Sequence, residues 1–291
     1  MNVWRRNFAA WARAWKAELL HCNQFAWVGC CARLPSLLAV HSDVVSWWRA
    51  VHGGPPPETA FHRWYRALAQ QALERASLVA SPTAAALAEL RRSFGFRGPA
   101  HVAPNGAEPP PPAPGPRAGA VCVGRLWDEG KQMRLLLRSD LAMDTVLAGA
   151  AAAPPGSAHP PPRHGRLRYV GELRRPQVAA LLARARLYVA PSRYEPFGLA
   201  PLEAALAGCC LLLNDLASFR EVWGDAAYFF YRDDGDDMAR WMRRLACQPA
   251  LLQAGATAAA VRARCRYTAA AMAGRYEALY HRLLPPPAPP R

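Results

Sequence analysis

Short runs of apolar residues alternate with amphipathic segments through the second half of the chain. Each run is apolar throughout, which is typical of strands buried on both faces of a sheet. The segments between the runs are expected to be helical, so the pattern predicts an α/β fold with a parallel sheet covered by helices. The expected strands are 120–123, 144–148, 167–170, 187–190, 210–213 and 227–230, and the expected helices are 131–139, 176–185, 199–207 and 217–223.

The first hundred residues carry a shorter version of the same pattern. Apolar runs predict strands at 17–21, 37–40 and 77–80, and helical spacing predicts a helix at 62–76. A further helix is expected after Ser81-Pro82, with the serine as N-cap.

An aromatic stripe marks the expected helix at 3–18. Trp4, Phe8, Trp11 and Trp15 recur on one face, and basic residues lie mostly elsewhere. Such a stripe can pack on a sheet, and a basic amphipathic helix can also lie on a membrane. The sequence leaves both interpretations open.

Proline divides the chain. It supplies 28 of 291 residues, and the clearest boundary is the cluster at 109–119, which can neither continue a helix nor join a sheet. We therefore expect a first domain at 1–108, a semi-rigid linker at 109–119 and a second domain at 120–265. The proline-rich stretch 154–162 is expected to be a surface loop, and 285–291 a disordered tail.

The chain is strongly basic. It has 36 Lys and Arg against 21 Asp and Glu, a net charge of +15, which favours an anionic ligand or surface. The arginines are dispersed and no recognised nucleic-acid motif is present, so we expect no nucleic-acid partner. No apolar run approaches the length of a membrane span, and the eight cysteines form no Cys-x-x-Cys pair. These features indicate a reducing, cytoplasmic location.

Two glutamates follow the expected strand 187–190, and loops at the carboxyl ends of parallel strands are where ligands bind. Glu195 lies in the loop and Glu203 about one turn into the next helix, so both can face one crevice. Between them, Phe197-Gly198-Leu199 opens the helix, whose free N–H groups suit a phosphate. The alternative is that both glutamates are ordinary acids stabilising a helix start.

A second loop, after strand 120–123, begins with Gly124 and presents Arg125 and Lys131. Two cations beside a helix start suit a diphosphate, whose departure requires charge neutralisation. The alternative is a solvated basic loop.

Together these two loops resemble the C-terminal domain of retaining glycosyltransferases of family 4, which have the GT-B fold. The family pattern is a Gly-Arg…Lys loop followed by Glu-x7-Glu enclosing Phe-Gly-Leu. The resemblance covers about 78–282 and implies two Rossmann-like domains facing a cleft, with a helix at 266–284 that crosses back to the first domain. Other family-like pieces stand at 80–83, 104–106, 147–149, 169–171, 207–208 and 220–225.

The resemblance also implies roles. Arg125 and Lys131 would hold the donor diphosphate, Glu195 the sugar hydroxyls and Glu203 the nucleotide ribose. Gly124 and the backbone of Phe197, Gly198 and Leu199 would contact the donor, and His41, after strand 37–40, would face the donor sugar. His41 could equally be a structural histidine. The family needs no metal, and no Asp-x-Asp motif is present.

One family feature is not found. The first domain of the family opens with a strand and a Gly-rich loop, and nothing near the start of this sequence matches them. We therefore expect an incomplete N-terminal domain, through either a truncated record or loss of the segment.

The resemblance implies transfer of a sugar from a nucleoside-diphosphate sugar, with retained configuration, to a sugar, lipid-linked or small-molecule acceptor. The alternative is a non-catalytic binding protein that keeps the donor half. A peripheral contact with an anionic membrane at its inner face stays open. The sequence names neither the sugar, the base nor the acceptor.

Overall fold

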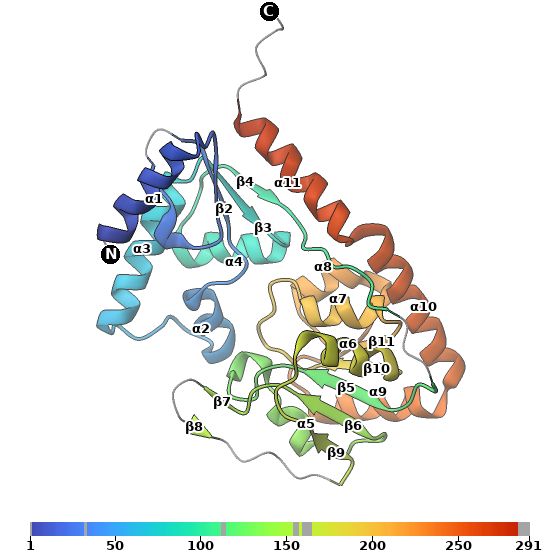
Figure 1. Ribbon diagram of the computed structural model, residues 1–291. Coiled ribbons are helices and arrows are strands. Elements are labelled where there is room, and N and C mark those ends of the chain that lie inside the picture. Colours follow the sequence, from blue (N-terminus) through green and yellow to red (C-terminus); the bar gives the residue numbers. More distant parts are fainter. Residues whose placement is uncertain (1, 32–33, 112–114, 154–156, 159–164, 285–291) are drawn as a thin grey trace, which may run out of the picture. The chain divides into compact units, whose positions relative to one another are not determined.

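The computed structural model describes residues 2–31, 34–111, 115–153, 157–158 and 165–284 (Figure 1). The chain divides into two compact units: residues 1–104 with those from 270 onward, and residues 105–269. The boundary thus precedes the expected linker. The end of that linker belongs to the second unit, because Ala118 N donates to the Arg184 carbonyl at 2.9 Å. The predicted tail at 285–291 and most of the predicted loop at 154–162 lie outside the described residues.

The first unit contains a four-stranded parallel sheet in the order β1-β2-β3-β4, whose first strand begins at Leu20, three residues later than predicted. Its core packs residues of the strands against α3 and α4. The strands are β1 (Leu20–Cys22), β2 (Ser36–Ala39), β3 (Leu78–Ser81) and β4 (Ala100–Val102), and the helices are α1 (Asn2–Ala14), α2 (Val44–His52), α3 (Ala60–Arg75), α4 (Ala84–Phe94) and the C-terminal α11 (Ala269–Leu283).

The start of α4 differs from the prediction. Ser81 belongs to strand β3, and its carbonyl accepts a hydrogen bond from Ala103 N. Thr83 is the N-cap, with its hydroxyl accepting from Ala86 N at 3.0 Å. Pro82 therefore precedes the cap, because the pairing of β3 extends further than the apolar run indicated.

Helix α11 packs with the strands of the first unit. Tyr276 and Leu279 are buried in one cluster with Leu37 and Ala39 of β2. The Tyr280 hydroxyl lies 2.7 Å from Nδ1 of His21 on β1. This last helix therefore completes the apolar core of the unit that the first hundred residues begin.

The aromatic stripe of α1 is not uniformly buried. Phe8 packs near Trp27 with ring centroids 5.5 Å apart, whereas Trp11 and Trp15 are 50% and 78% exposed. Packing of the whole stripe on a sheet was the wrong interpretation for these two tryptophans. The side chain of Trp4 lies outside the described residues.

The second unit contains the six-stranded parallel sheet that the sequence predicted, and its strands stand in the order β12-β11-β10-β5-β6-β9. The strands of this sheet are β5 (Ala120–Val123), β6 (Thr145–Ala148), β9 (Leu167–Tyr169), β10 (Leu187–Ala190), β11 (Cys210–Asn214) and β12 (Tyr228–Phe230). A separate antiparallel pair consists of β7 (Ala152–Ala153) and β8 (Ser157–Ala158). The helices are α5 (Arg134–Arg138), α6 (Arg175–Arg184), α7 (Leu199–Leu206), α8 (Ala217–Trp223), α9 (Gly235–Cys247) and α10 (Pro249–Arg266).

Both faces of this sheet are covered. Tyr188 of β10 belongs to a buried cluster with Leu202 of α7 and Phe219 of α8. Its neighbour Val189 belongs to a second cluster with Met238 of α9. Successive residues of one strand thus enter opposite cores, which explains why the strands are apolar without alternation.

The order of the strands places a switch point between β5 and β10. From β5 the chain runs outward through β6 to β9, and then returns to β10 and continues through β11 to β12 on the other side. In open parallel sheets, ligands bind at the carboxyl ends of the two strands that flank such a reversal. The loops after β5 and β10 are those that carry the predicted Arg/Lys and Glu residues.

One predicted helix is broken. The sequence predicted a single helix at 131–139, but a 3-10 turn occupies Glu129–Lys131 and α5 occupies only Arg134–Arg138. Gln132 lies between them in the left-handed region, with φ of 50°. This irregular turn keeps Lys131 at the mouth of the sheet instead of within a regular helix.

Candidate donor site at the switch point

Backbone hydrogen bonds join the loops after β5 and β10. The Gly130 carbonyl accepts from Arg193 N at 2.8 Å and from Tyr194 N at 3.3 Å. These bonds bring Lys131 to Glu195, whose Nζ and Oε2 atoms are 2.5 Å apart. The structure therefore unites two predicted site residues that lie 64 positions apart in the sequence.

The ion pair is partly shielded from water. Only 23% of the Lys131 side chain and 15% of the Glu195 side chain are exposed. The Glu195 carbonyl accepts from the Ser218 hydroxyl at 2.5 Å, which ties the loop to α8. Lower exposure strengthens electrostatic interactions at this position.

Arg125 takes a different partner. Its Nη2 lies 2.5 Å from Asp128 Oδ2, and its guanidinium stacks 4.8 Å from the centre of the Trp127 ring. Asp128 is buried, and its other oxygen accepts from Gly130 N at 2.9 Å. Arg125 itself remains 55% exposed, so its guanidinium is held in the loop yet accessible to an anion.

Gly124 and Gly149 allow the loops after β5 and β6 to pack together. A Cβ atom on Gly149, where φ is +148°, would lie 1.9 Å from the Gly124 carbonyl oxygen. A Cβ on Gly124 would lie 2.3 Å from Met133 Cε. The predicted donor-contacting Gly124 thus also has a packing role that fixes the Arg125 loop.

Gly198 forms the start of α7. Its φ is +93°, and a Cβ there would meet Phe219 at 2.8 Å and Glu195 Cγ at 3.3 Å. Phe197 is buried against Tyr267, with ring centroids 5.5 Å apart, and Leu199 is 48% exposed. Only the backbone of Phe197 is therefore placed to meet a ligand, while the helix start has no side-chain cap.

Glu203 lies on α7 beyond the first helical turn, and that turn contains no acidic residue. The alternative that both glutamates serve as helix-start acids is therefore wrong. Burial raises the pKa of the Glu203 carboxyl, while Arg175, 4.0 Å away, opposes this shift. A half-buried carboxylate with so distant a partner is suited to accept hydrogen bonds from ligand hydroxyls.

His41 belongs to the first unit. It follows β2, is exposed, and its Nε2 lies 3.1 Å from Asn23 Oδ1. Partial desolvation of the ring lowers the pKa of His41, which favours the neutral imidazole. Its role toward the donor sugar stays a prediction.

Sequence reasoning missed the polar residues that support the Glu195 loop. Asn214, at the carboxyl end of β11, is fully buried and its Nδ2 donates to the Ser192 carbonyl at 2.9 Å. The Asn214 amide also bonds Asp233, whose side chain pairs with Arg193 at 3.2 Å. The sequence offered one signal for Asn214, because it is a polar residue at the end of an otherwise apolar strand, at the edge of the sheet where a ligand was predicted.

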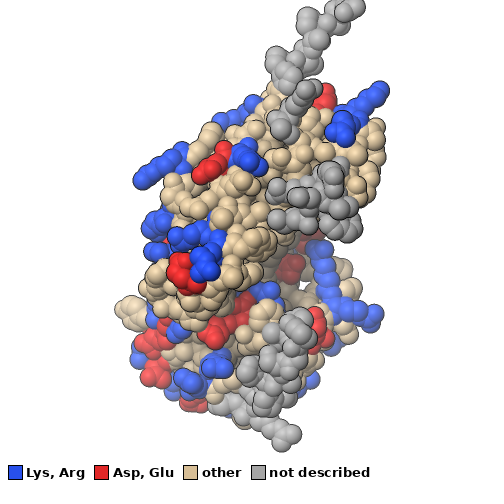
Figure 2. All heavy atoms as spheres, turned by 90° about the vertical axis from the view of Figure 1, so that its left-hand side faces the viewer, with Lys and Arg blue, Asp and Glu red and all other residues tan. Residues whose placement is uncertain are grey.

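Other features of the described chain bear on the class of site. Among the residues that the structure describes, no three His, Cys, Asp or Glu side chains gather as metal ligands would. None of the described helices combines the length and apolar character needed to cross a bilayer. On the face drawn in Figure 2, basic side chains are interspersed with acidic ones over both units rather than forming one continuous patch.

Comparisons with solved structures agree with the fold. Sucrose-phosphate synthase from Thermosynechococcus elongatus superposes with a TM-score of 0.81 at 20% identity, over 96% of this chain and 77% of that one. Anabaena Alr3699/HepE, solved with UDP-glucose, superposes with a TM-score of 0.75 at 14% identity, over 96% of this chain and 82% of that one. Both likenesses extend over both units.

Curated relatives match over shorter stretches. The lipopolysaccharide core biosynthesis mannosyltransferase LpcC of Rhizobium leguminosarum is 31% identical over 167 residues, 57% of this chain and 42% of that protein. Glycogen synthase of Mycobacterium tuberculosis is 38% identical over 94 residues, 32% of this chain and 23% of that protein. The chain thus aligns with less than half the length of these relatives.

Two family models account for most of the sequence. The model described as Glycosyltransferase Family 4 matches residues 1–109, and that described as Glycosyl transferases group 1 matches residues 117–248. They lie in the order of the two units, and the second contains the whole Lys131–Glu195 site. The chain belongs to the group 1, family 4 glycosyltransferases and has their GT-B fold.

Proposed function

We propose that this chain transfers a sugar from a nucleoside-diphosphate sugar to an acceptor, with retention of configuration at the anomeric carbon. The observation that carries the proposal is the Lys131–Glu195 pair at the switch point between β5 and β10. The pair offers a cation for a phosphate and a carboxylate for sugar hydroxyls within one site. The UDP-glucose bound by Anabaena HepE supports a donor of this class.

The donor would replace an existing contact. On binding, a diphosphate oxygen takes the Lys131 ammonium, and the Glu195 carboxylate turns to the sugar hydroxyls. Arg125, accessible beside Trp127, supplies the second cation. Because backbone hydrogen bonds hold the two loops together independently of this ion pair, the exchange leaves the loops in place as charge develops on the leaving diphosphate.

The chemical step would be a front-face displacement. The bond between the anomeric carbon and the diphosphate oxygen breaks as the acceptor oxygen attacks from the same side. The acceptor proton passes to the leaving phosphate oxygen, whose negative charge Arg125 and Lys131 stabilise. His41 would face the donor sugar, and Glu203 would accept hydrogen bonds from the ribose.

The acceptor class is a sugar, lipid-linked or small molecule. Exposed Trp11 on α1 and exposed Trp15 just after its end, with Arg13 between them, support a peripheral contact with an anionic membrane. Such a contact would place a lipid-linked acceptor within reach of the first unit.

Calorimetry with UDP, GDP and ADP tests the donor part of the proposal. We expect one of them to bind the native chain with a dissociation constant in the micromolar range, as is usual for enzyme substrates. Lys131→Ala should weaken that affinity, whereas Lys16→Ala, at the exposed lysine of the first unit, should leave it unchanged. Affinity that is insensitive to Lys131 would rule out the switch point as the nucleotide site.

Glu203→Gln separates a binding role from a structural one. Loss of a charged acceptor should weaken nucleoside-diphosphate affinity by about 1–3 kcal/mol. The pKa of Glu203 is raised by burial, so its ionised form destabilises the folded state at neutral pH but not at a pH below the ordinary glutamate pKa. The variant should therefore melt no lower than the native chain at pH 7, and its advantage should disappear in acid.

Calorimetry and thermal melts at several pH values measure both effects. A variant that melts lower at pH 7 and binds the nucleotide normally would reduce Glu203 to a structural residue.

A further inference from the structure

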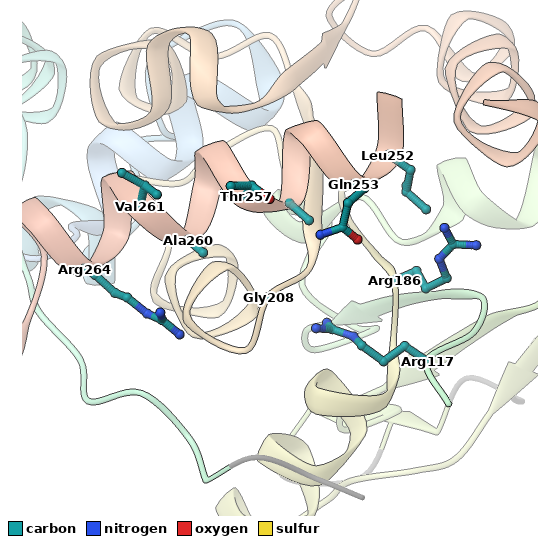
Figure 3. Close-up of a pocket in the computed structure, with 10 residues that line it drawn as sticks. Arg117, Arg186, Gly208, Leu252, Gln253, Thr257, Ala260, Val261 and Arg264 are labelled. Carbon is teal, nitrogen blue, oxygen red and sulfur yellow. The ribbon is translucent and has the colours of Figure 1, made fainter. Parts of the chain in front are cut away.

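Three arginines line a pocket at the opposite edge of the second sheet from the donor site. Arg117 precedes β5, Arg186 precedes β10, and Arg264 lies on α10 (Figure 3). The strands are parallel, so their amino ends lie at the edge opposite the loops that carry Lys131 and Glu195. The pocket, of about 370 Å³, is built entirely from the second unit and is separate from the donor site.

The first of these arginines is firmly held. Arg117 Nε and Nη2 donate to the Ala185 carbonyl at 3.0 and 2.6 Å, and Nη2 lies 3.6 Å from Cys209 Sγ. Its guanidinium occupies space that only a glycine leaves free, because a Cβ on Gly208 would lie 2.5 Å from Nη1. Gly208 also has a φ of +85°. The turn before β11 is therefore shaped around this guanidinium.

The charge of the pocket is uncompensated. None of the described residues that line it is acidic, and within the described chain none of its three arginines forms an ion pair. By contrast, Arg125 and Arg220 each pair with a carboxylate at 2.5 and 2.7 Å. Three cations without an ion-pair partner around one pocket create a local positive potential that attracts a multiply charged anion.

The remaining lining comes from one face of α10. Gln253 and Thr257, one turn apart, offer polar groups, and Leu252, Ala256 and Ala260 form an apolar surface beside them. Figure 3 shows Arg117 and Arg264 extending toward the turn at Gly208 beneath this helix. A volume of about 370 Å³ is that of a small-molecule site.

We propose that this arginine pocket binds the phosphate group of a phosphorylated ligand, independently of the donor. Guanidinium groups recognise phosphate oxygens in bidentate fashion, and the positive potential of the pocket attracts a dianionic phosphate more strongly than a monoanionic carboxylate. The apolar face of α10 accommodates the body of the ligand. The phosphate can belong to a soluble phosphomonoester or to a lipid headgroup, because both present the same chemistry.

Calorimetry of the full chain with glycerol 3-phosphate tests the site. The titration is run in the Lys131→Ala variant as well as in the native chain, so that phosphate binding at the donor site is not counted. We expect the double variant Arg186→Ala with Arg264→Ala to weaken the affinity at least tenfold. Arg243 is an exposed residue of α9 outside the pocket, and Arg243→Ala should leave the affinity unchanged. Arg117 is left intact because its hydrogen bonds support the fold.

Cosedimentation with phosphatidic acid vesicles, against phosphatidylcholine vesicles, distinguishes the two sources of phosphate. Capture by phosphatidic acid that depends on Arg186 and Arg264 assigns a lipid headgroup. Binding of glycerol 3-phosphate alone, with the same dependence, assigns a soluble ligand. If neither probe binds in a manner that depends on these two arginines, or if only Lys131→Ala abolishes phosphate binding, the proposal is wrong.

Discussion

Replacing Lys131 by alanine should slow sugar transfer by about 100-fold or more, the usual effect of removing one charge partner of a transition state. The substitution removes a cation from the leaving diphosphate and leaves Glu195, of which only 15% is exposed, without its partner at 2.5 Å. Rates of nucleoside-diphosphate release from the donor, with and without acceptor, measure the effect.

A control variant and a second site variant separate an effect on catalysis from an effect on folding. Lys16→Ala removes the other lysine of the chain, and should leave the rate unchanged. Glu195→Gln keeps the shape of the loop but removes the carboxylate, so it should also lower the rate while retaining nucleotide affinity. Equal rates for native protein and Lys131→Ala, with melting temperatures that agree, would exclude Lys131 from the leaving-group site.

The composition of the chain makes a lysine at position 131 unusual. Only two of the 36 basic residues are lysines. Lysine presents a compact ammonium, whereas arginine presents a wide planar group. Beside the Glu195 carboxylate, where the two side chains are mostly shielded from water, the smaller cation fits the available contact.

Gly149→Ala should destabilise the second unit by about 2 kcal/mol or more, since backbone strain alone costs about 1–3 kcal/mol at such positions. The φ of +148° is unfavourable for alanine, and the new Cβ would lie 1.9 Å from the backbone oxygen of Gly124. Because that neighbour is backbone, the loop that carries Arg125 must move. Denaturant unfolding should report the lost stability, and calorimetry should report weaker nucleotide binding.

Gly165→Ala is the matched control. Among the residues that the structure describes, no atom lies within 4 Å of the position that its Cβ would occupy, and its φ is not in the left-handed region. Its free energy of unfolding should therefore stay within about 1 kcal/mol of the native value. If Gly149→Ala were as stable as Gly165→Ala, the close packing of the loops after β5 and β6 would be disproved.

The sheet of the second unit could be predicted because its strands are buried on both faces. Runs such as 210–213 are apolar at every position, and Leu211 and Leu212 enter opposite cores. Helices α9 and α10 were not predicted, although both are long. They follow the last apolar run of the sequence, so no later strand marks where each helix begins or ends.

The contact between Lys131 and Glu195 could not be derived from residue patterns alone. It requires β5 and β10 to be neighbours, yet β6 and β9 lie between them in the sequence. The family resemblance implied roles for Lys131 and Glu195, and the order of the strands in the structure explains why the two residues are close together. The irregular turn at Gln132 was also hidden, because a left-handed glutamine has no sequence signal comparable to glycine.

Exposure was the least predictable property. The sequence placed Trp11 and Trp15 on one helical face with Phe8, yet α1 ends at Ala14, and among the described residues Phe8 packs near Trp27 while both tryptophans are exposed. Periodicity shows that residues share a face but not whether anything covers that face. The arginine pocket was missed for a related reason, because its three cations come from segments far apart in the sequence.

Proton NMR of a slowly hydrolysed α-linked donor sugar tests the central claim most directly. With water as the acceptor, the native chain should release nucleoside diphosphate and the α-anomer of the sugar first, before mutarotation produces the β-anomer, and Lys131→Ala should release neither at a comparable rate. Initial release of the β-anomer, or turnover that is unaffected by loss of Lys131, would contradict a retaining transfer at the Lys131–Glu195 site.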